Sequence, residues 1–254
     1  MPFLIRDGVR LHYQVTGEGP PLVLHHGFAG SWAVWRHFGF VRQLQSRYRL
    51  IMPDARGHGL SGKPHDSRAY SMSERIDDVL AVLDELQIER THFFGYSMGG
   101  LVAYGLARRA QHRLRSLTIG AAHPYLDHSW EVFAGVDGSN PDAFITALET
   151  AVNERLSDEV RASVLSNDLW ALSAAAKRKR PALDHILPAI QVPCLLYCGD
   201  ADARHAAVQR CAAALPDGRF VSLPGLGHFA GMMRCDIVMP HILSFLNEQL
   251  GKDT

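Results

Sequence analysis

Residues 91–100 read Thr-His-Phe-Phe-Gly-Tyr-Ser-Met-Gly-Gly and contain the pattern Gly-x-Ser-x-Gly around Ser97. The apolar run before the pattern is typical of a buried strand, and the apolar residues from Leu101 to Ala107 fit a buried helix. Gly95 and Gly99 lack the Cβ atoms that would clash where strand and helix approach closely. The sequence therefore predicts a strand, a tight turn and a helix, with the Ser97 hydroxyl exposed at the end of a sheet.

A lone pentapeptide is a modest signal, because a glycine-rich chain can contain one by composition. A catalytic role for Ser97 also requires a base, an acid and a group of oxyanion donors elsewhere in the chain.

The composition predicts one large α/β domain with a substantial core, since 254 residues are 47% hydrophobic. Lys plus Arg and Asp plus Glu balance at 26 each, which argues against nucleic acid or an anionic membrane as partner and favours a small, weakly charged molecule. With no signal-peptide pattern and no apolar run of 18 residues, we expect a soluble, cytoplasmic chain.

Neither a metal site nor a cofactor site is indicated by the histidines and cysteines. The 14 histidines include no His-Glu-x-x-His, and no paired Cys-x-x-Cys occurs. Cys194 and Cys198 bracket an apolar run, so we interpret them as small buried residues of a strand.

The first sixty residues supply further strands and a glycine-rich loop. Asp7-Gly8 joins two strand-like runs and predicts a tight hairpin. The loop at 26–30, His-Gly-Phe-Ala-Gly, follows a buried strand, and its glycines allow backbone N–H groups to face a bound oxygen. Ser31 is expected to cap a helix that runs to Leu44, and His58, in the glycine-rich loop 54–61, is expected to be structural.

A capping box of Ser71 and Glu74 predicts a helix that continues to Leu86. Near the end of the chain, Asp200 and Asp202 follow a predicted strand, and either carboxylate could orient a base. His228 follows the last predicted strand on a glycine-flanked loop, and its imidazole is suited to accept a serine proton at neutral pH.

Together these motifs resemble the α/β-hydrolase fold superfamily, in its esterase, enol-lactonase and carbon-carbon hydrolase branch. The resemblance implies an α/β fold with a mostly parallel eight-stranded sheet, helices on both faces and a helical cap insertion. It implies a core at 1–120 and 190–254 and a cap at 121–189.

The same resemblance implies a triad of Ser97, Asp202 and His228, because the family pattern Gly-x-x-Asp maps onto Asp202 rather than Asp200. It also implies an oxyanion hole formed by the backbone N–H groups of Met98 and Phe28. Ala203-Arg204-His205 departs from relatives that carry a proline-containing turn there.

Within the insertion, the pattern predicts short helices at 143–152, 158–165 and 169–176. Aromatic and leucine side chains of this segment could line an apolar pocket, although they are also typical of plain core: Trp130, Phe133, Phe144, Leu169 and Trp170. The charged run Lys177 to Arg180 is interpreted as a solvated helix terminus.

The resulting hypothesis is a serine carboxylesterase that takes a small ester or related carbonyl substrate. Ser97 argues against the dehalogenase and epoxide-hydrolase branches, which by resemblance carry an aspartate there. Enol-lactone or carbon-carbon bond hydrolysis, cofactor-free perhydrolysis and a ligand receptor of low turnover remain alternatives. Nothing in the sequence indicates the oligomeric state.

Overall fold

A computed structural model describes residues 2–251 of the chain. Its centre is a single eight-stranded sheet in the order β1-β2-β4-β3-β5-β6-β7-β8. The strands are β1 (Phe3–Arg6), β2 (Val9–Thr16), β3 (Pro21–His25), β4 (Arg49–Pro53), β5 (Thr91–Tyr96), β6 (Leu114–Gly120), β7 (Cys194–Gly199) and β8 (Gly218–Leu223). Pairs β1·β2 and β2·β4 are antiparallel and the others are parallel, which confirms the mostly parallel eight-stranded sheet.

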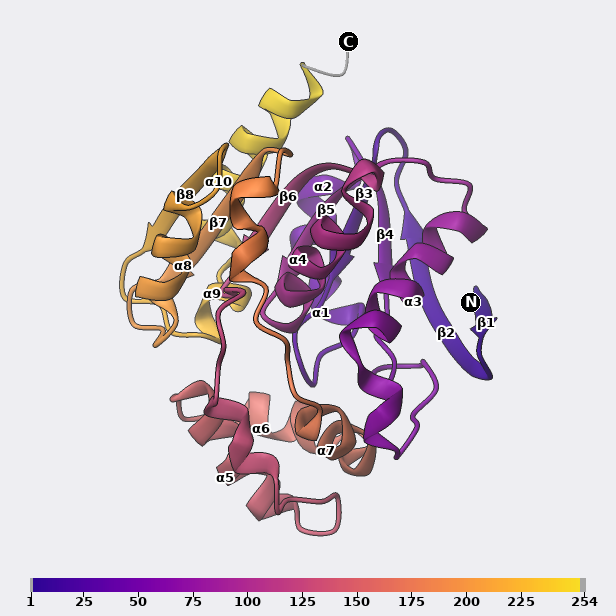
Figure 1. The fold of residues 1–254 in the computed structure, drawn as a ribbon, viewed down its shortest axis with the longest axis vertical. Helices are drawn as coiled ribbons and strands as arrows, with labels where there is room; N and C mark the ends of the chain where they lie inside the picture. The colour runs from indigo at the N-terminus through magenta and orange to yellow at the C-terminus, as the bar shows by residue number, and fades with distance from the viewer. Residues whose placement is uncertain (1, 252–254) are drawn as a thin grey trace.

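Helices cover both faces of this sheet (Figure 1). The core helices are α1 (Ala33–His37), α2 (Phe40–Leu44), α3 (Met72–Glu85), α4 (Met98–Ala110), α8 (His205–Ala213), α9 (Ala230–Met233) and α10 (Cys235–Leu250). Helices α3, α4 and α8 lie on the near face in Figure 1, and α1, α2 and α10 lie behind the sheet. The 3-10 segments are η1 (Ser67–Tyr70), η2 (Gln111–Arg113), η3 (Ser129–Phe133) and η4 (Asp184–Ala189).

Local sequence signals explain the first turns. Asp7 and Gly8 both have positive φ, 48° and 76°, as a type I′ hairpin turn requires. The Ser71 hydroxyl accepts a hydrogen bond from the backbone N–H of Glu74, so the predicted start of α3 is confirmed.

The helix expected from Ser31 to Leu44 is wrong in two respects. The N-cap of the first helix is Trp32 rather than Ser31, and the segment forms two five-residue helices, α1 and α2. Gly39 lies between them with φ at 92°, a left-handed conformation that stops the first helix. The break lets both Trp35 and Phe40 pack against Phe94 of the central strand β5.

Between β6 and β7 the described chain forms helices and loops without a strand. The helices are α5 (Pro141–Val152), α6 (Asp158–Leu165) and α7 (Leu169–Lys177), each with a side-chain N-cap from Asn140, Ser157 or Asp168. They lie together beyond one end of the sheet, joined to it by two long connections (Figure 1). We call residues 121–189 the cap.

The largest apolar cluster fills the space between sheet and core helices, and a second cluster lies mostly within the cap. All four cysteines are buried and free, as expected for Cys194 and Cys198 in β7. Within residues 2–251, no helix is long and apolar enough to cross a membrane.

Candidate active site

Ser97 occupies the turn between β5 and α4 in a strained backbone conformation, with φ at 51° and ψ at −108°. Positive φ is uncommon for a residue with a Cβ and is tolerated where the surroundings enforce it. A Cβ on Gly95 would lie 2.3 Å from the carbonyl oxygen of Gly99, and a Cβ on Gly99 would lie 2.1 Å from that of His25. Glycine at both positions therefore allows strand, turn and helix to meet this closely.

The structure brings Ser97, His228 and Asp202 together in one hydrogen-bonded chain. His228 Nε2 lies 3.0 Å from Ser97 Oγ, and His228 Nδ1 lies 2.7 Å from Asp202 Oδ2. The three residues follow three different strands of the parallel sheet, so their loops meet at the same edge. This is the geometry of a nucleophile, a base and a group that orients the base.

Asp202 is buried and its carboxylate is well satisfied, since Oδ1 accepts the backbone N–H of Arg204 at 2.9 Å. Burial opposes ionisation, but the hydrogen bond and charge of His228 and the Arg204 contacts together lower the pKa of Asp202 to about 2. Asp200 is placed differently: its Oδ1 accepts the backbone N–H of Gly225 at 2.7 Å. Of the two aspartates that the sequence left as candidates, Asp202 contacts His228 and Asp200 stabilises a turn.

Two backbone N–H groups beside Ser97 have no hydrogen-bond partner within residues 2–251, those of Phe28 and Met98. Met98 begins α4, where the N–H groups of the first turn are unpaired and carry a partial positive charge. The loop that contains Phe28 passes Ser97 closely, because a Cβ on Gly27 would lie 3.5 Å from Ser97 Cβ. These groups are suited to bind an oxyanion formed at Ser97.

A cavity of about 370 Å³ opens beside Ser97 and His228, between the core and the cap. Its walls are mostly apolar and come from the glycine-rich loop, α1, α5, α6 and the segment after His228: Phe28, Val34, Phe38, Trp130, Leu148, Val152, Val160, Val164, Phe229 and Met232. Such a volume and lining suit a small organic molecule.

The pocket residues proposed from the cap sequence divide into three groups. Trp130 lines the cavity. Phe133, Phe144 and Leu169 are buried in the cap core and do not reach the cavity.

Trp170 also does not reach the cavity, so its prediction as a pocket residue is wrong. Helix α7 packs inward through Ala171, Leu172 and Ala175, so Trp170 lies on its outer face, 48% exposed, near His65. The lining pairs Leu148 with Val152 and Val160 with Val164 were missed, although each pair has the i, i+4 spacing of one helix face.

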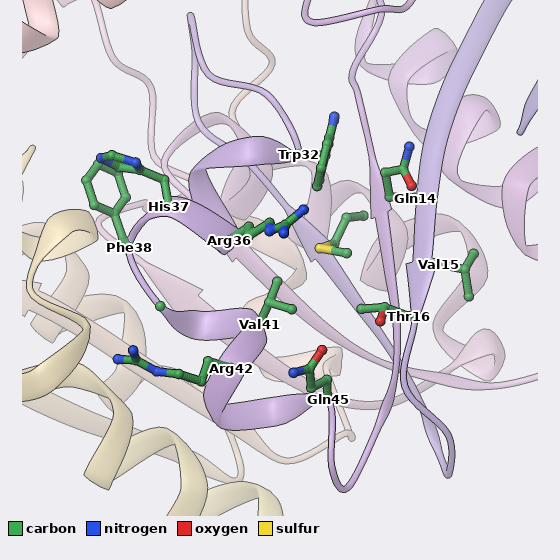
Figure 2. Close-up of a pocket in the computed structure, with 12 residues that line it drawn as sticks. Gln14, Val15, Thr16, Trp32, Arg36, His37, Phe38, Val41, Arg42 and Gln45 are labelled. Carbon is green, nitrogen blue, oxygen red and sulfur yellow. The ribbon is translucent and has the colours of Figure 1, made fainter. Parts of the chain in front are cut away.

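A second, larger hollow of about 620 Å³ lies over β2, α1 and α2 (Figure 2). Gln14, Trp32, Arg36, Val41 and Gln45 line it, and it shares His37 and Phe38 with the cavity beside Ser97. No serine or cysteine is among its lining residues. Thr16 supplies a hydroxyl there, but it forms no hydrogen bond to a histidine within residues 2–251, so the Ser97 cavity is the candidate active site.

Arg180 is a charged neighbour of Ser97 that the sequence interpretation placed in solvent. Lys177, Arg178 and Lys179 are exposed as expected, but Arg180 turns inward and its guanidinium carbon lies 4.0 Å from the centre of the Trp130 indole ring. A small cavity of about 20 Å³ is lined by both Ser97 and Arg180, and also by Asp127 and Arg204. Neither a hydrogen bond nor an ion pair of Arg180 occurs within residues 2–251.

Burial, and next the nearby charge of Arg75, lower the pKa of Arg180 to about 9. Asp127, which lines the same small cavity, opposes this decrease without forming a hydrogen bond or ion pair to Arg180 within the described residues. A guanidinium in such a position is suited to bind an anion.

Comparison with known proteins identifies the family. The model of the alpha/beta hydrolase fold family matches residues 20–182, and the chain belongs to this family. A Bacillus subtilis relative, named as a putative 2-succinyl-6-hydroxy-2,4-cyclohexadiene-1-carboxylate synthase, is 29% identical over 88% of this chain and 90% of its own length.

Two solved structures share the complete fold. A thermophilic esterase from Thermogutta terrifontis, solved with malate bound, has 26% identity and a TM-score of 0.82, with 97% of each chain covered. Est816, described as an enzyme that degrades N-acyl homoserine lactones, has 29% identity and a TM-score of 0.79 over 96% of this chain and 100% of its own.

Proposed function

We propose that this protein is a serine hydrolase that cleaves a small carboxylic ester through an acyl-enzyme on Ser97. The observation that carries the proposal is the continuous contact from Ser97 through His228 to buried Asp202 at the wall of an apolar cavity. The esterase and lactone-degrading activities named for the two similar structures agree with it.

In the first half of the reaction, Ser97 Oγ attacks the ester carbonyl carbon while His228 Nε2 takes the hydroxyl proton. The Asp202 carboxylate accepts a hydrogen bond from the Nδ1–H of His228 and stabilises the imidazolium. The negative charge moves to the carbonyl oxygen, which the N–H groups of Phe28 and Met98 bind. His228 then donates its proton to the departing alcohol oxygen, and the acyl group remains on Ser97.

In the second half, a water molecule takes the place of the alcohol. His228 accepts one proton from this water as its oxygen attacks the acyl carbon. The carbon-oxygen bond to Ser97 breaks, Ser97 recovers its proton from His228, and the carboxylic acid leaves. The apolar walls supplied by residues such as Val34 and Val160 suit an uncharged alkyl or aryl group of the substrate.

The test is steady-state hydrolysis of p-nitrophenyl esters from acetyl to decanoyl, together with labelling by a fluorophosphonate. We expect turnover and one label per chain, both lost in Ser97→Ala, and turnover lost in His228→Ala. Ser163→Ala is the matched control, because Ser163 also lines the cavity and its hydroxyl forms no hydrogen bond to a histidine within residues 2–251. Labelling that persists at full stoichiometry in Ser97→Ala would contradict the proposal.

A second candidate function is hydrolysis of an enol-lactone or carbon-carbon bond in a substrate that carries a carboxylate. Arg180 favours it, because its guanidinium lines a cavity with Ser97 and has no acidic side chain within hydrogen-bonding distance among residues 2–251. The Bacillus subtilis relative is named for a succinyl-substituted carboxylate, and the Thermogutta terrifontis esterase was solved with the dicarboxylate malate.

A matched substrate pair tests whether the substrate carries a carboxylate that binds Arg180. We compare kcat/KM for p-nitrophenyl hydrogen glutarate with that for p-nitrophenyl pentanoate, which has nearly the same length and no charge. If a carboxylate binds Arg180, Arg180→Gln lowers the ratio of these values about tenfold or more. Lys177→Gln, at an exposed position of the same charged run, leaves the ratio unchanged. An unchanged ratio in Arg180→Gln would reject the carboxylate-bearing substrate.

A further inference from the structure

The backbone of His228 is held from two sides. The phenolic hydroxyl of Tyr96, on β5, donates to the His228 carbonyl oxygen at 2.5 Å. On the opposite side, the Glu154 carboxylate accepts the backbone N–H of His228 at 2.5 Å and that of Phe229 at 3.4 Å. Tyr96 belongs to the core, whereas Glu154 belongs to the cap, 74 residues away from His228 in sequence. The conformation of the His228 loop therefore depends on a contact that crosses between the two parts of the chain.

The end of α5 directs the Glu154 side chain toward this loop. Asn153 ends the helix in the left-handed conformation, with φ at 55°, and the backbone N–H of Glu154 bonds to the carbonyl of Glu149 at 3.1 Å. Gly227 leaves space for the carboxylate, because a Cβ there would lie 2.6 Å from a Glu154 oxygen. Within residues 2–251, Glu154 forms no ion pair, so backbone N–H groups supply its hydrogen bonds.

The same end of α5 also contacts the loop of the acid. Arg204 donates from Nη2 to the carbonyl oxygen of Ala151 at 3.0 Å, while its backbone N–H donates to Asp202 Oδ1. Residues 151–154 thus touch the Asp202 loop through Arg204 and the His228 loop through Glu154. An apolar contact could hold the cap against the core, but these directional hydrogen bonds also fix where the two loops lie relative to each other.

We infer that Glu154 is a positioning residue, through which the docked cap sets the imidazole of His228 in line with Ser97. This inference rests on the proposed function for its effect on turnover, whereas the contact itself belongs to the fold. Without an acceptor at position 154, the N–H of His228 is left unpaired and the loop relaxes. A displacement of the base by about 1 Å is expected to lower the rate about 10²-fold, because proton transfer needs close approach.

The experiment compares two substitutions of similar size at this position. Glu154→Gln keeps an oxygen that accepts N–H bonds, and Glu154→Met removes it. We expect Glu154→Met to lower kcat about 10- to 100-fold with KM changed less than about threefold, and Glu154→Gln to retain kcat within about threefold. Glu131→Met makes the same replacement at an exposed cap position that contacts His128, and we expect no effect on kcat.

All kcat values are expressed per site titrated with fluorophosphonate, so that misfolded protein does not count. A loss in Glu154→Met that disappears on this basis, an equal loss in Glu154→Gln, or a change confined to KM would overturn the inference.

Hydrogen exchange of the backbone amides in residues 226–231 gives a readout that does not require turnover. We expect faster exchange of this segment in Glu154→Met than in wild type, with Glu154→Gln and Glu131→Met close to wild type. If the wild type neither hydrolyses esters nor labels at Ser97, the proposed function fails, and the exchange result alone decides the role of Glu154. Unchanged exchange in Glu154→Met would then reject it.

Discussion

Arg56 and Asp78 form a buried two-point ion pair, with Nε and Nη2 of the arginine each 2.6 Å from a carboxylate oxygen. Arg6 contributes a third hydrogen bond to Asp78 at 2.9 Å. Arg56 and Asp78 join the loop after β4 to helix α3, and Arg6 adds the edge hairpin of β1 and β2. Together the three residues hold the edge of the sheet to the helix layer.

Replacing Asp78 by Asn should lower the free energy of unfolding by about 3 kcal/mol, because it leaves the buried Arg56 charge with weaker compensation. For a chain of this size the corresponding drop in Tm is roughly 6–12 °C. Asp77→Asn is the control, because the Asp77 carboxylate pairs with Arg109 nearer the surface. Its replacement should cost less than about 1 kcal/mol. Urea unfolding of both variants checks this. Equal losses in the two would contradict the special role of the buried pair.

Gly99→Ala should prevent the turn at Ser97 from forming as observed. The added methyl group would meet the backbone carbonyl of His25, which cannot move away as a flexible side chain could. We expect a loss of several kcal/mol or of soluble protein, together with loss of fluorophosphonate labelling. At Gly135 a Cβ meets nothing within 4 Å, so Gly135→Ala is the matched control and should behave as wild type. Normal stability and labelling of Gly99→Ala would show that the turn tolerates a Cβ.

Features with local signals could be predicted from the sequence. The Asp7-Gly8 hairpin, the Ser71 cap and the Gly-x-Ser-x-Gly turn each depend on residues within a few positions of one another. The three cap helices were also predicted near their observed bounds, because their N-caps are local. The division into core and cap at residues 121 and 189 stays a prediction.

Features set by distant packing could not be predicted in this way. The helix period gave no indication that α7 turns Trp170 outward, since the buried face of α7 is decided by its contacts with other elements. Arg180 was placed in solvent because it ends a charged run, yet it stacks on Trp130, 50 positions earlier. The contact of Glu154 with His228 has no sequence motif at all.

The strained backbone of Ser97 gives a prediction that separates catalysis from stability. Ser97→Ala and Ser97→Gly should both abolish turnover and labelling, because neither carries a hydroxyl. Ser97→Gly should nevertheless unfold with a free energy about 1 kcal/mol higher than Ser97→Ala, since glycine adopts positive φ without steric cost. Thermal and urea unfolding of the two inactive variants measure the difference. A less stable glycine variant would mean that the observed φ of 51° costs little.

Three buried histidines should make the protein lose stability in mild acid. Burial lowers the pKa of His25 to about 3 and also lowers the pKa values of His26 and His58. The positive charge of Arg75 adds to the decrease in all three. The negative charge of Asp54 opposes it at His26. The unfolded histidines take up protons below about pH 6.5, while the folded ones stay neutral.

Because the unfolded state then binds more protons, the free energy of unfolding should be fully retained above about pH 6.5 and fall as the pH decreases, by up to about 1.4 kcal/mol per pH unit for each histidine. Urea unfolding at pH 7.5, 6.5, 5.5 and 4.5 measures the slope. His58→Asn keeps a donor for the Arg56 carbonyl oxygen. It should reduce the slope by the contribution of one histidine, up to about 1.4 kcal/mol per pH unit. A stability that stays constant from pH 7 to pH 5 would show that these side chains take up protons in the folded protein as readily as in the unfolded chain.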